Sequence, residues 1–208
     1  MIFWICFAFL FPIIGILWPT TVVNKNHLPS AKKQNVIVAC NHMSNVDLPL
    51  VAVKFCRKFT YIGKAELFKN KFFGWFLKKF DVIPVDRTKA DLGAIKKVLN
   101  AINRKRHVCI CPQGTRSKPG EIDENTVKDG ISLFALRTGT PVLPMVILKK
   151  PRVFRHNKIV VGDLIYPDMS RAKDKEYSEE FTKLVVAKMN ELLASGGKKK
   201  NANKNEGR

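Results

Sequence analysis

The sequence predicts an α/β domain in which helices flank a mixed, largely parallel sheet, with a hydrophobic membrane segment at the N-terminus. Short apolar stretches rich in β-branched residues alternate along the chain with amphipathic helical patterns, which is typical of α/β folds. The second observation is that residues 2–18 contain no charged side chain. We therefore expect a membrane segment at 1–19, one folded domain at 20–194 and a disordered basic tail at 195–208.

The uncharged N-terminal segment contains several aromatic residues and is interrupted by Pro12 and Gly15. It is marginally short for a full span of roughly 20 residues, so crossing the bilayer, tilting and lying in the interface all stay open. No Lys or Arg precedes the segment, whereas Lys25 is the first of several that follow it. The positive-inside bias then places the domain on the cytoplasmic face of the cell membrane.

The net charge indicates an anionic partner. The chain has 37 Lys and Arg against 17 Asp and Glu, a formal net charge of +20. An anionic membrane surface and nucleic acid both fit this charge. No zinc-finger spacing, RNA-recognition signature or basic heptad region is present, and the uncharged N-terminus also argues against a nucleic-acid partner. Five scattered Cys residues favour a reducing compartment over a disulfide-rich secreted class.

The first strand pattern, at residues 35–40, is followed directly by His42. Ser44 and Asp47 have the spacing of a capping box, so we expect a helix from Ser44 whose first turn folds the Asp47 carboxylate back towards the imidazole. A carboxylate that holds one imidazole nitrogen leaves the other free to act as a general base. The alternative is that Asp47 only caps the helix.

Residues 54–80 alternate basic and aromatic side chains. Phe72, Phe76 and Phe80 recur every fourth residue, which predicts an amphipathic helix with one apolar and one basic face. Such a helix can lie in a lipid interface or contact an acyl chain, and nucleic-acid stacking or ordinary core packing are the alternatives. We favour the lipid because the N-terminal segment already indicates a bilayer.

Residues 82–85 form a short extended pattern, and residues 88–106 form a helical one with Thr88 and Asp91 at capping-box spacing. Arg87 lies between them, where a guanidinium and nearby backbone N–H groups can bind a phosphate.

A second strand pattern, at 107–111, leads into the loop 112–117. Gly114 lets the backbone approach a ligand closely, Thr115 supplies a hydroxyl and Arg116 matches phosphate geometry. The remaining predicted elements are a helix at 128–138, strands at 141–148 and 158–161, and a helix at 176–194.

Four blocks occur in the order found in one enzyme family, namely residues 41–47 (NHMSNVD), 82–87 (VIPVDR), 112–117 (PQGTRS) and 141–145 (PVLPM). The chain therefore resembles the glycerolipid acyltransferases defined by a His, four residues and an Asp. The resemblance implies transfer of a fatty acyl group from acyl-CoA or acyl carrier protein to 1-acyl-sn-glycerol 3-phosphate, forming phosphatidic acid in phospholipid biosynthesis. It implies no metal, no cofactor beyond that acyl co-substrate, and no nucleic-acid partner.

The same resemblance assigns the roles of individual residues. His42 would be the catalytic base and Asp47 would orient it. The substrate-binding residues would be Lys64, Arg87, Gln113, Gly114, Thr115 and Arg116, with the cations holding the acceptor's phosphate.

Two departures from the family pattern affect these expectations. The family usually has Glu at the position of Gln113 and Gly at the position of Asp81. Because Gln lacks the charge of Glu, the acceptor could be another lyso-lipid such as lyso-ornithine lipid. A thiolate mechanism using Cys40, Cys109 or Cys111 is a weaker alternative, and a zinc site at these thiols and His42 is weaker still.

Overall fold

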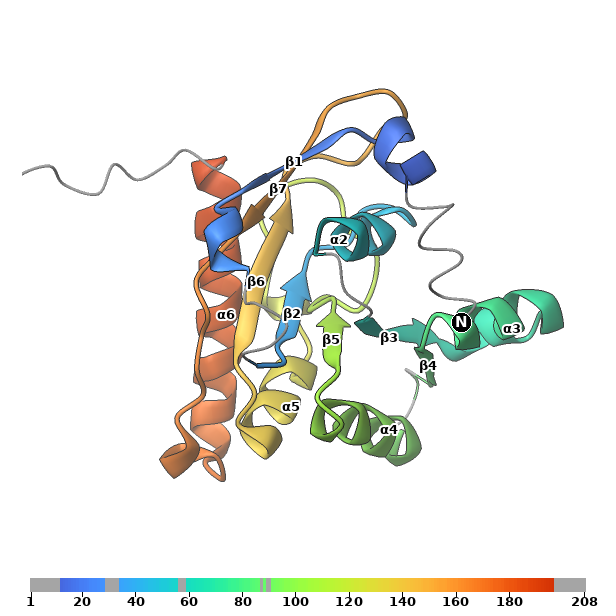
Figure 1. The fold of residues 1–208 in the computed structure, drawn as a ribbon. Coiled ribbons are helices and arrows are strands. Elements are labelled where there is room, and N and C mark those ends of the chain that lie inside the picture. The colour runs from blue at the N-terminus through green and yellow to red at the C-terminus, as the bar shows by residue number, and fades with distance from the viewer. Residues whose placement is uncertain (1–11, 29–33, 56–58, 87, 89–90, 197–208) are drawn as a thin grey trace, which may run out of the picture.

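The structure, a computed structural model, describes residues 12–28, 34–55, 59–86, 88 and 91–196. These residues form a seven-stranded sheet with helices on both faces (Figure 1). The strands are β1 (Thr20–Val23), β2 (Ile37–Cys40), β3 (Phe59–Lys64), β4 (Val82–Val85), β5 (His107–Ile110), β6 (Val142–Ile147) and β7 (Asn157–Val161). The α-helices are α2 (Asp47–Phe55), α3 (Lys71–Lys79), α4 (Leu92–Asn103), α5 (Gly130–Thr138) and α6 (Lys175–Ser195). Single-turn helices are η1 (Lys25–His27), η2 (Ala65–Phe68), η3 (Glu124–Thr126) and η4 (Met169–Arg171).

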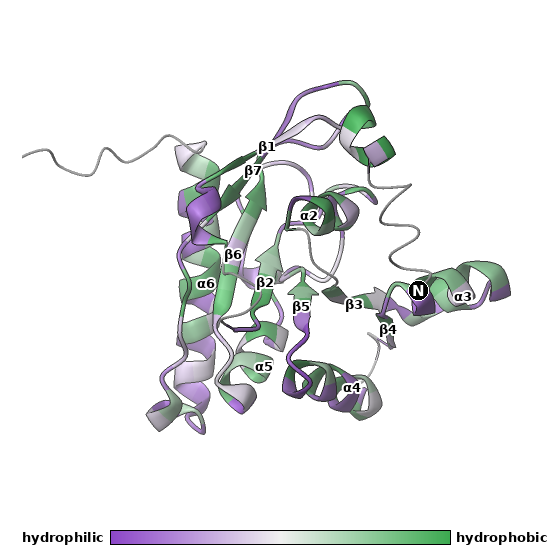
Figure 2. Cartoon of the chain, in the orientation of Figure 1, coloured by the Kyte–Doolittle hydropathy of each residue, from purple (hydrophilic) through white to green (hydrophobic). Residues whose placement is uncertain are grey.

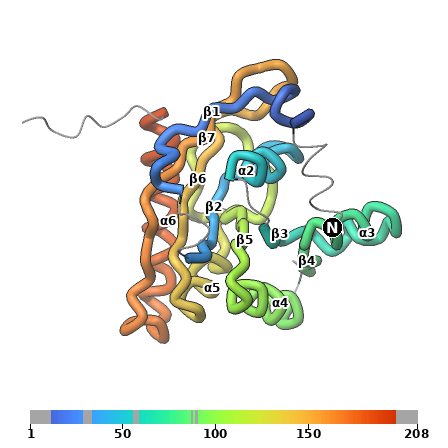
Figure 3. Tube along the Cα trace, in the orientation of Figure 1, coloured from blue at the N-terminus to red at the C-terminus, as the bar shows by residue number. Residues whose placement is uncertain are grey.

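The strand order is β1-β7-β6-β2-β5-β3-β4. The strands from β6 to β4 are parallel to one another, β7 is antiparallel to β6, and β1 is parallel to β7. The tube in Figure 3 follows the chain from β2 through α2 to β3 and β4, then back through α4 to β5. The predicted mixed, largely parallel sheet is confirmed, and the carboxyl ends of its parallel strands share one edge, where ligands bind in open α/β sheets.

Alternation along β2 divides the core into two layers. Ile37 and Ala39 point into the apolar layer formed with α4, α5 and α6, whereas Val38 and Cys40 point into the layer formed with α2. All four side chains are fully buried. A strand covered on both faces must be apolar throughout, which explains the continuous apolar run that predicted it.

Part of the predicted membrane segment packs against the domain. Residues 12–17 are helical, and Ile14 and Trp18 contact the layer on the α2 side. Ile13 and Ile16 are 52% and 70% exposed. None of the helices in the described ranges is both long enough and apolar enough to cross a bilayer. Residues 1–11, which carry most of the predicted segment, lie outside those ranges, as do residues 197–208 of the predicted tail.

Two helices begin later than predicted. α2 begins at Asp47 rather than Ser44, although the Ser44 N–H donates to Asp47 Oδ2 at 2.5 Å, as the predicted capping box requires. α4 begins at Leu92 rather than Thr88, since Asp91 accepts a hydrogen bond from the Ala94 N–H at 2.9 Å. The Thr88 hydroxyl donates instead to Asp86 Oδ1 at 2.6 Å. The capping-box prediction for Thr88 was therefore wrong, and Asp91 is the cap.

The predicted amphipathic helix is α3, and its aromatic face is not part of the core. Gly74 is the buried residue of α3, and a Cβ added there would lie 2.9 Å from the Phe68 carbonyl oxygen, so the helix approaches η2 closely. Phe72 is 78% exposed and Trp75 50%. The Lys79 ammonium lies 5.6 Å from the centre of the Trp75 ring. Phe76 and Phe80, the other residues of the predicted apolar stripe, are half-buried with ring centroids 4.6 Å apart, so the stripe is only partly exposed.

Candidate active site

His42 and Asp47 meet at the carboxyl end of β2. His42 lies two residues past the strand and Asp47 is the first residue of α2. The distance from His42 Nδ1 to Asp47 Oδ2 is 3.1 Å. The same oxygen accepts the backbone N–H groups of Met43 and Ser44, each at 2.5 Å. Because Asp47 is acceptor-only as a carboxylate, Nδ1 carries the proton in this contact and Nε2 is the basic nitrogen.

The environment of Asp47 argues against a purely structural cap. Its side chain is fully buried, whereas the His42 side chain is 20% exposed. Within the described residues, Asp47 Oδ1 is buried and has no hydrogen-bond partner. A buried carboxylate oxygen without a partner lowers the stability of the folded state. If this position served only to cap α2, a side chain without that oxygen would give a more stable protein. This arrangement fits a residue kept to orient His42.

Two further residues fix the His42 backbone, and neither was among the predicted site residues. The Asn41 amide donates to the Ile147 carbonyl at 2.9 Å and accepts the Ile147 N–H at 2.8 Å, which joins the end of β2 to the end of β6. Ser117 donates its N–H at 2.8 Å and its hydroxyl at 3.3 Å to the His42 carbonyl. A polar residue directly after an apolar strand was the one sequence signal for Asn41.

The loop 112–117 is a tight turn beside the dyad. Gly114 has φ +66°, a left-handed conformation that favours glycine, and its N–H donates to the Cys111 carbonyl at 2.9 Å. The Lys128 N–H donates to the Pro112 carbonyl at 3.1 Å, which joins the loop to the segment before α5. The structure thus brings this loop to His42, through the Ser117 contact described above.

The predicted substrate-binding residues of the loop differ in their exposure. Thr115 and Arg116 are exposed on the loop, and Gln113 is half-buried. No described contact joins the Arg116 side chain to the dyad. Arg87 lies outside the described residues, so its role stays a prediction.

Lys64 ends β3, at the same edge of the sheet as the dyad. Tyr61 of β3 is level with Cys109 of β5, and β5 lies between β3 and β2. Lys64 Nζ forms an exposed ion pair with Glu66 at 3.1 Å. A backbone hydrogen bond, and then Lys64, hold the pKa of Glu66 below its ordinary value. Lys64 therefore faces solvent with a carboxylate partner, and β5 separates its strand from β2, which His42 follows.

Two of the three cysteines of the thiolate alternative do not fit the role of nucleophile. Cys40 and Cys109 are buried, and burial is the main cause that raises the pKa of each thiol well above its ordinary value. Neighbouring thiols and Asp47 raise the pKa of Cys40 further. A buried thiol with a raised pKa is protonated near neutral pH and is a poor nucleophile. Among the described residues, no group of three or more His, Cys, Asp or Glu is arranged to hold a metal ion.

The site can therefore supply a fixed general base next to a donor-rich loop. The oriented imidazole can take a proton from a hydroxyl, and the tight turn with its N–H groups can stabilise negative charge on an oxygen.

The sequence model of a family described as Acyltransferase matches residues 19–148. The 1-acyl-sn-glycerol-3-phosphate acyltransferase of Bacillus subtilis is 27% identical over 191 residues, which cover 86% of this chain and 91% of that protein. The enzyme of the same name from Borreliella burgdorferi is 29% identical, covering 76% of this chain and 65% of that protein. The crystal structure of the 1-acyl-sn-glycerophosphate acyltransferase PlsC from Thermotoga maritima matches with a TM-score of 0.62 at 23% identity, covering 85% of this chain and 72% of that one. That structural match supports the fold, and the family match spans more than half of the sequence. This chain belongs to the acyltransferase family.

Proposed function

We propose that this acyltransferase moves a fatty acyl group from acyl-CoA or acyl carrier protein to the free hydroxyl of 1-acyl-sn-glycerol 3-phosphate, forming phosphatidic acid. The observation that carries the proposal is the 3.1 Å contact between His42 Nδ1 and the buried Asp47 carboxylate. The names of the relatives supply the acceptor, since the Bacillus and Borreliella proteins are both called 1-acyl-sn-glycerol-3-phosphate acyltransferases.

The proposed reaction has one nucleophilic step. His42 Nε2 takes the proton of the acceptor hydroxyl while that oxygen attacks the thioester carbonyl carbon. The resulting tetrahedral intermediate collapses, an oxygen ester forms, the carbon–sulfur bond breaks, and the thiolate leaves with the proton from His42. Asp47 stabilises the imidazolium between the two proton transfers. The N–H groups of the loop other than those of Gly114 and Ser117, which bond the Cys111 and His42 carbonyls, are the proposed donors to the oxyanion.

The acceptor's phosphate is assigned to the cations Arg116, Arg87 and Lys64. Arg116 directly precedes Ser117, whose N–H and hydroxyl contact the His42 carbonyl, so its backbone is held close to the base. A guanidinium can donate two parallel hydrogen bonds to a phosphate. Gln113 lies in the same loop and is the residue proposed to set the acceptor.

The enzyme is further proposed to bind the cytoplasmic face of an anionic membrane. The support is the aromatic surface of α3, formed by Phe72, Phe73 and Trp75, which are 78%, 44% and 50% exposed. Lys71 and Lys78 lie on the same helix, and Figure 2 shows hydrophobic and hydrophilic residues side by side along it. Exposed aromatic residues among lysines match a bilayer interface with anionic head groups.

The test is a substrate panel. Purified protein in detergent receives labelled acyl-CoA or labelled acyl carrier protein, together with lysophosphatidate, neutral lysophospholipids or lyso-ornithine lipid, and the products are identified by mass spectrometry. The proposal expects phosphatidate to form fastest. If another lyso-lipid is preferred and Gln113→Glu shifts the preference to lysophosphatidate, then Gln113 sets a different acceptor, and the phosphatidate assignment is wrong.

A further inference from the structure

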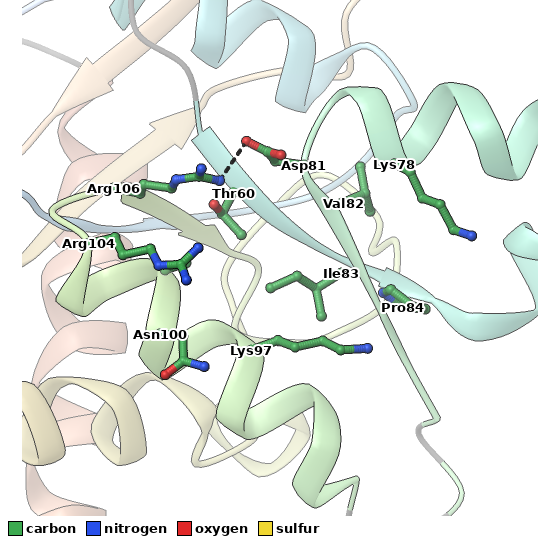
Figure 4. A pocket seen from close by; sticks show the side chains of 11 residues that line it. Thr60, Lys78, Asp81, Val82, Ile83, Pro84, Lys97, Asn100, Arg104 and Arg106 are labelled. Carbon is green, nitrogen blue, oxygen red and sulfur yellow. Dashed lines mark hydrogen bonds and ion pairs between the residues drawn. The ribbon is translucent and has the colours of Figure 1, made fainter.

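A pocket of about 390 Å³ lies away from the dyad (Figure 4). It is lined by Thr60 near the start of β3, by Val82 at the start of β4 and by Arg106 just before β5. These are the amino ends of parallel strands, whereas His42 follows the carboxyl end of β2. The pocket and the dyad therefore lie at opposite edges of the sheet, and a ligand in the pocket does not compete with the acceptor at His42.

The lining of this pocket is strongly cationic. The lining includes four basic side chains, from Lys78, Lys97, Arg104 and Arg106, and one carboxylate, Asp81. Arg106 Nη1 lies 3.0 Å from Asp81 Oδ2, and this pair closes one end of the hollow (Figure 4). Lys78 and Arg104 form no ion pair with any residue that the structure describes. Cations gathered around a concave surface without matching carboxylates create a positive potential that attracts an anion.

The floor of the pocket supplies an independent indication of a ligand. Thr60 is 2% exposed, and its hydroxyl is buried without a hydrogen-bond partner in the described part of the chain. It lies next to the Arg106–Asp81 pair (Figure 4). A buried hydroxyl with no partner is costly, so a small shift that opens it to the pocket would be offset by a hydrogen bond to a ligand oxygen.

The chemistry of the lining selects the ligand. Arg104 and Arg106 offer planar forks that suit phosphate oxygens, and the Asn100 amide adds a neutral donor. Val82 and Ile83 form an apolar wall on the β4 side. A volume of about 390 Å³ is larger than a bare phosphate ion needs and falls in the range of small-molecule pockets. We infer that this pocket binds a phosphate monoester that carries a carbon body.

Two sources of that chemistry are a lipid head group and a soluble phosphoester. Lys78 belongs to α3, the helix that also carries the exposed Phe72 and Trp75, so a phosphatidate head group could reach the pocket from a bilayer. Glycerol 3-phosphate represents the soluble source. The binding assay uses both, and neither reading requires acyl transfer.

The test is a binding measurement on the full chain with matched variants. Calorimetric titration with glycerol 3-phosphate is compared with sedimentation onto vesicles of phosphatidylcholine with and without phosphatidate. Lys97→Gln and Lys96→Gln remove the same charge from neighbouring positions of α4, but only Lys97 lines the pocket. Arg104→Gln should weaken binding at least about tenfold, the effect expected for losing a charge-assisted contact, and Lys97→Gln should weaken it severalfold. Lys96→Gln and His42→Ala should bind like the wild type.

Each result either supports or overturns the inferred phosphate-monoester site. Saturable binding of glycerol 3-phosphate, with the expected order of variants, supports the site with a soluble ligand. Binding seen only on phosphatidate vesicles, with the same order, supports it with a lipid head group. Equal losses in Lys97→Gln and Lys96→Gln, or no saturable binding of either probe, overturn the inference. His42→Ala is expected to bind both probes like the wild type. A failure of the proposed acyl transfer would therefore leave this binding result unchanged.

Discussion

Asn41 positions His42 without taking part in the proposed chemistry. Its amide satisfies both backbone groups of Ile147, so Asn41→Ala leaves a buried N–H and a buried carbonyl without their partner. We predict a loss of about 2–4 kcal/mol in the free energy of unfolding, measured by urea denaturation. We also predict a lower kcat with little change in the KM of the acceptor, since the base moves while the phosphate site stays. An unchanged denaturation midpoint would contradict this role.

The thiols beside the dyad should be unreactive in the folded protein. Burial raises the pKa of Cys40 and Cys109, so both keep their protons at pH 8. In the unfolded chain a thiol ionises near pH 8.5, so the folded state holds more protons above that pH and its stability falls as the pH rises further. Mass spectrometry should show slow iodoacetamide labelling of these two residues until denaturant is added. Rapid labelling of either one at pH 8 in native protein would revive the thiolate mechanism.

Arg116 is predicted to bind the acceptor's phosphate rather than the acyl donor. Losing a bidentate, charge-assisted contact costs on the order of 2 kcal/mol, so Arg116→Ala should raise the KM for lysophosphatidate about thirtyfold. Arg116→Lys should restore only part of the loss, because an ammonium cannot reproduce the planar fork. Steady-state kinetics in both substrates provides the measurement. An Arg116→Ala enzyme with an unaltered preference for phosphorylated acceptors would place the phosphate elsewhere.

At this scale, local contacts were predictable and distant ones were not. His42 and Asp47 are five residues apart, and the turn between a strand and a helix brings them together, so their contact could be inferred from spacing. Asn41 and Ile147 are 106 residues apart, and Ser117 and His42 are 75 apart. Such pairs form only when particular strands and loops become neighbours. The sequence around a single residue does not reveal which ones do.

At the scale of elements, α3 is predicted to bind membranes through its exposed aromatic face. Replacing Phe72 and Trp75 together with Ser should reduce sedimentation with anionic vesicles at least severalfold, because full burial of one large apolar side chain contributes roughly 1.5–3 kcal/mol. Thermal unfolding should change little, since neither side chain belongs to the core. Leu184→Ser on α6, at a site 44% exposed, is the control and should sediment like the wild type. Equal sedimentation of the double variant would show that α3 is not the contact.

The sequence located most elements from their periodicity and misplaced their ends. α2 begins three residues later than predicted, and α4 begins four residues later because the Asp91 side chain accepts the first-turn Ala94 N–H. β3 was not predicted, since its residues lie in a stretch where lysines and aromatic residues alternate. β1 was also missed, because its pairing partner β7 lies more than 130 residues along the chain.

At the scale of the whole molecule, the sheet order separates two edges with different chemistry. The dyad lies at the carboxyl ends of the parallel strands, and the cationic pocket lies at the amino ends. The α/β class was predictable from alternating patterns. The insertion of β5 between β2 and β3 was not, because it is set by long-range pairing and by the packing of α4 against α5.

His42, oriented by Asp47, is the proposed base for acyl transfer. The most direct measurement is the rate of phosphatidate formation from labelled acyl-CoA and lysophosphatidate by the wild type, His42→Ala and Asp47→Asn, with circular dichroism of each protein. General base catalysis contributes about 10²–10⁴-fold, so His42→Ala should lose at least about a hundredfold in kcat while staying folded, and Asp47→Asn should also be severely impaired. A folded His42→Ala enzyme that forms phosphatidate at the wild-type rate would contradict the account.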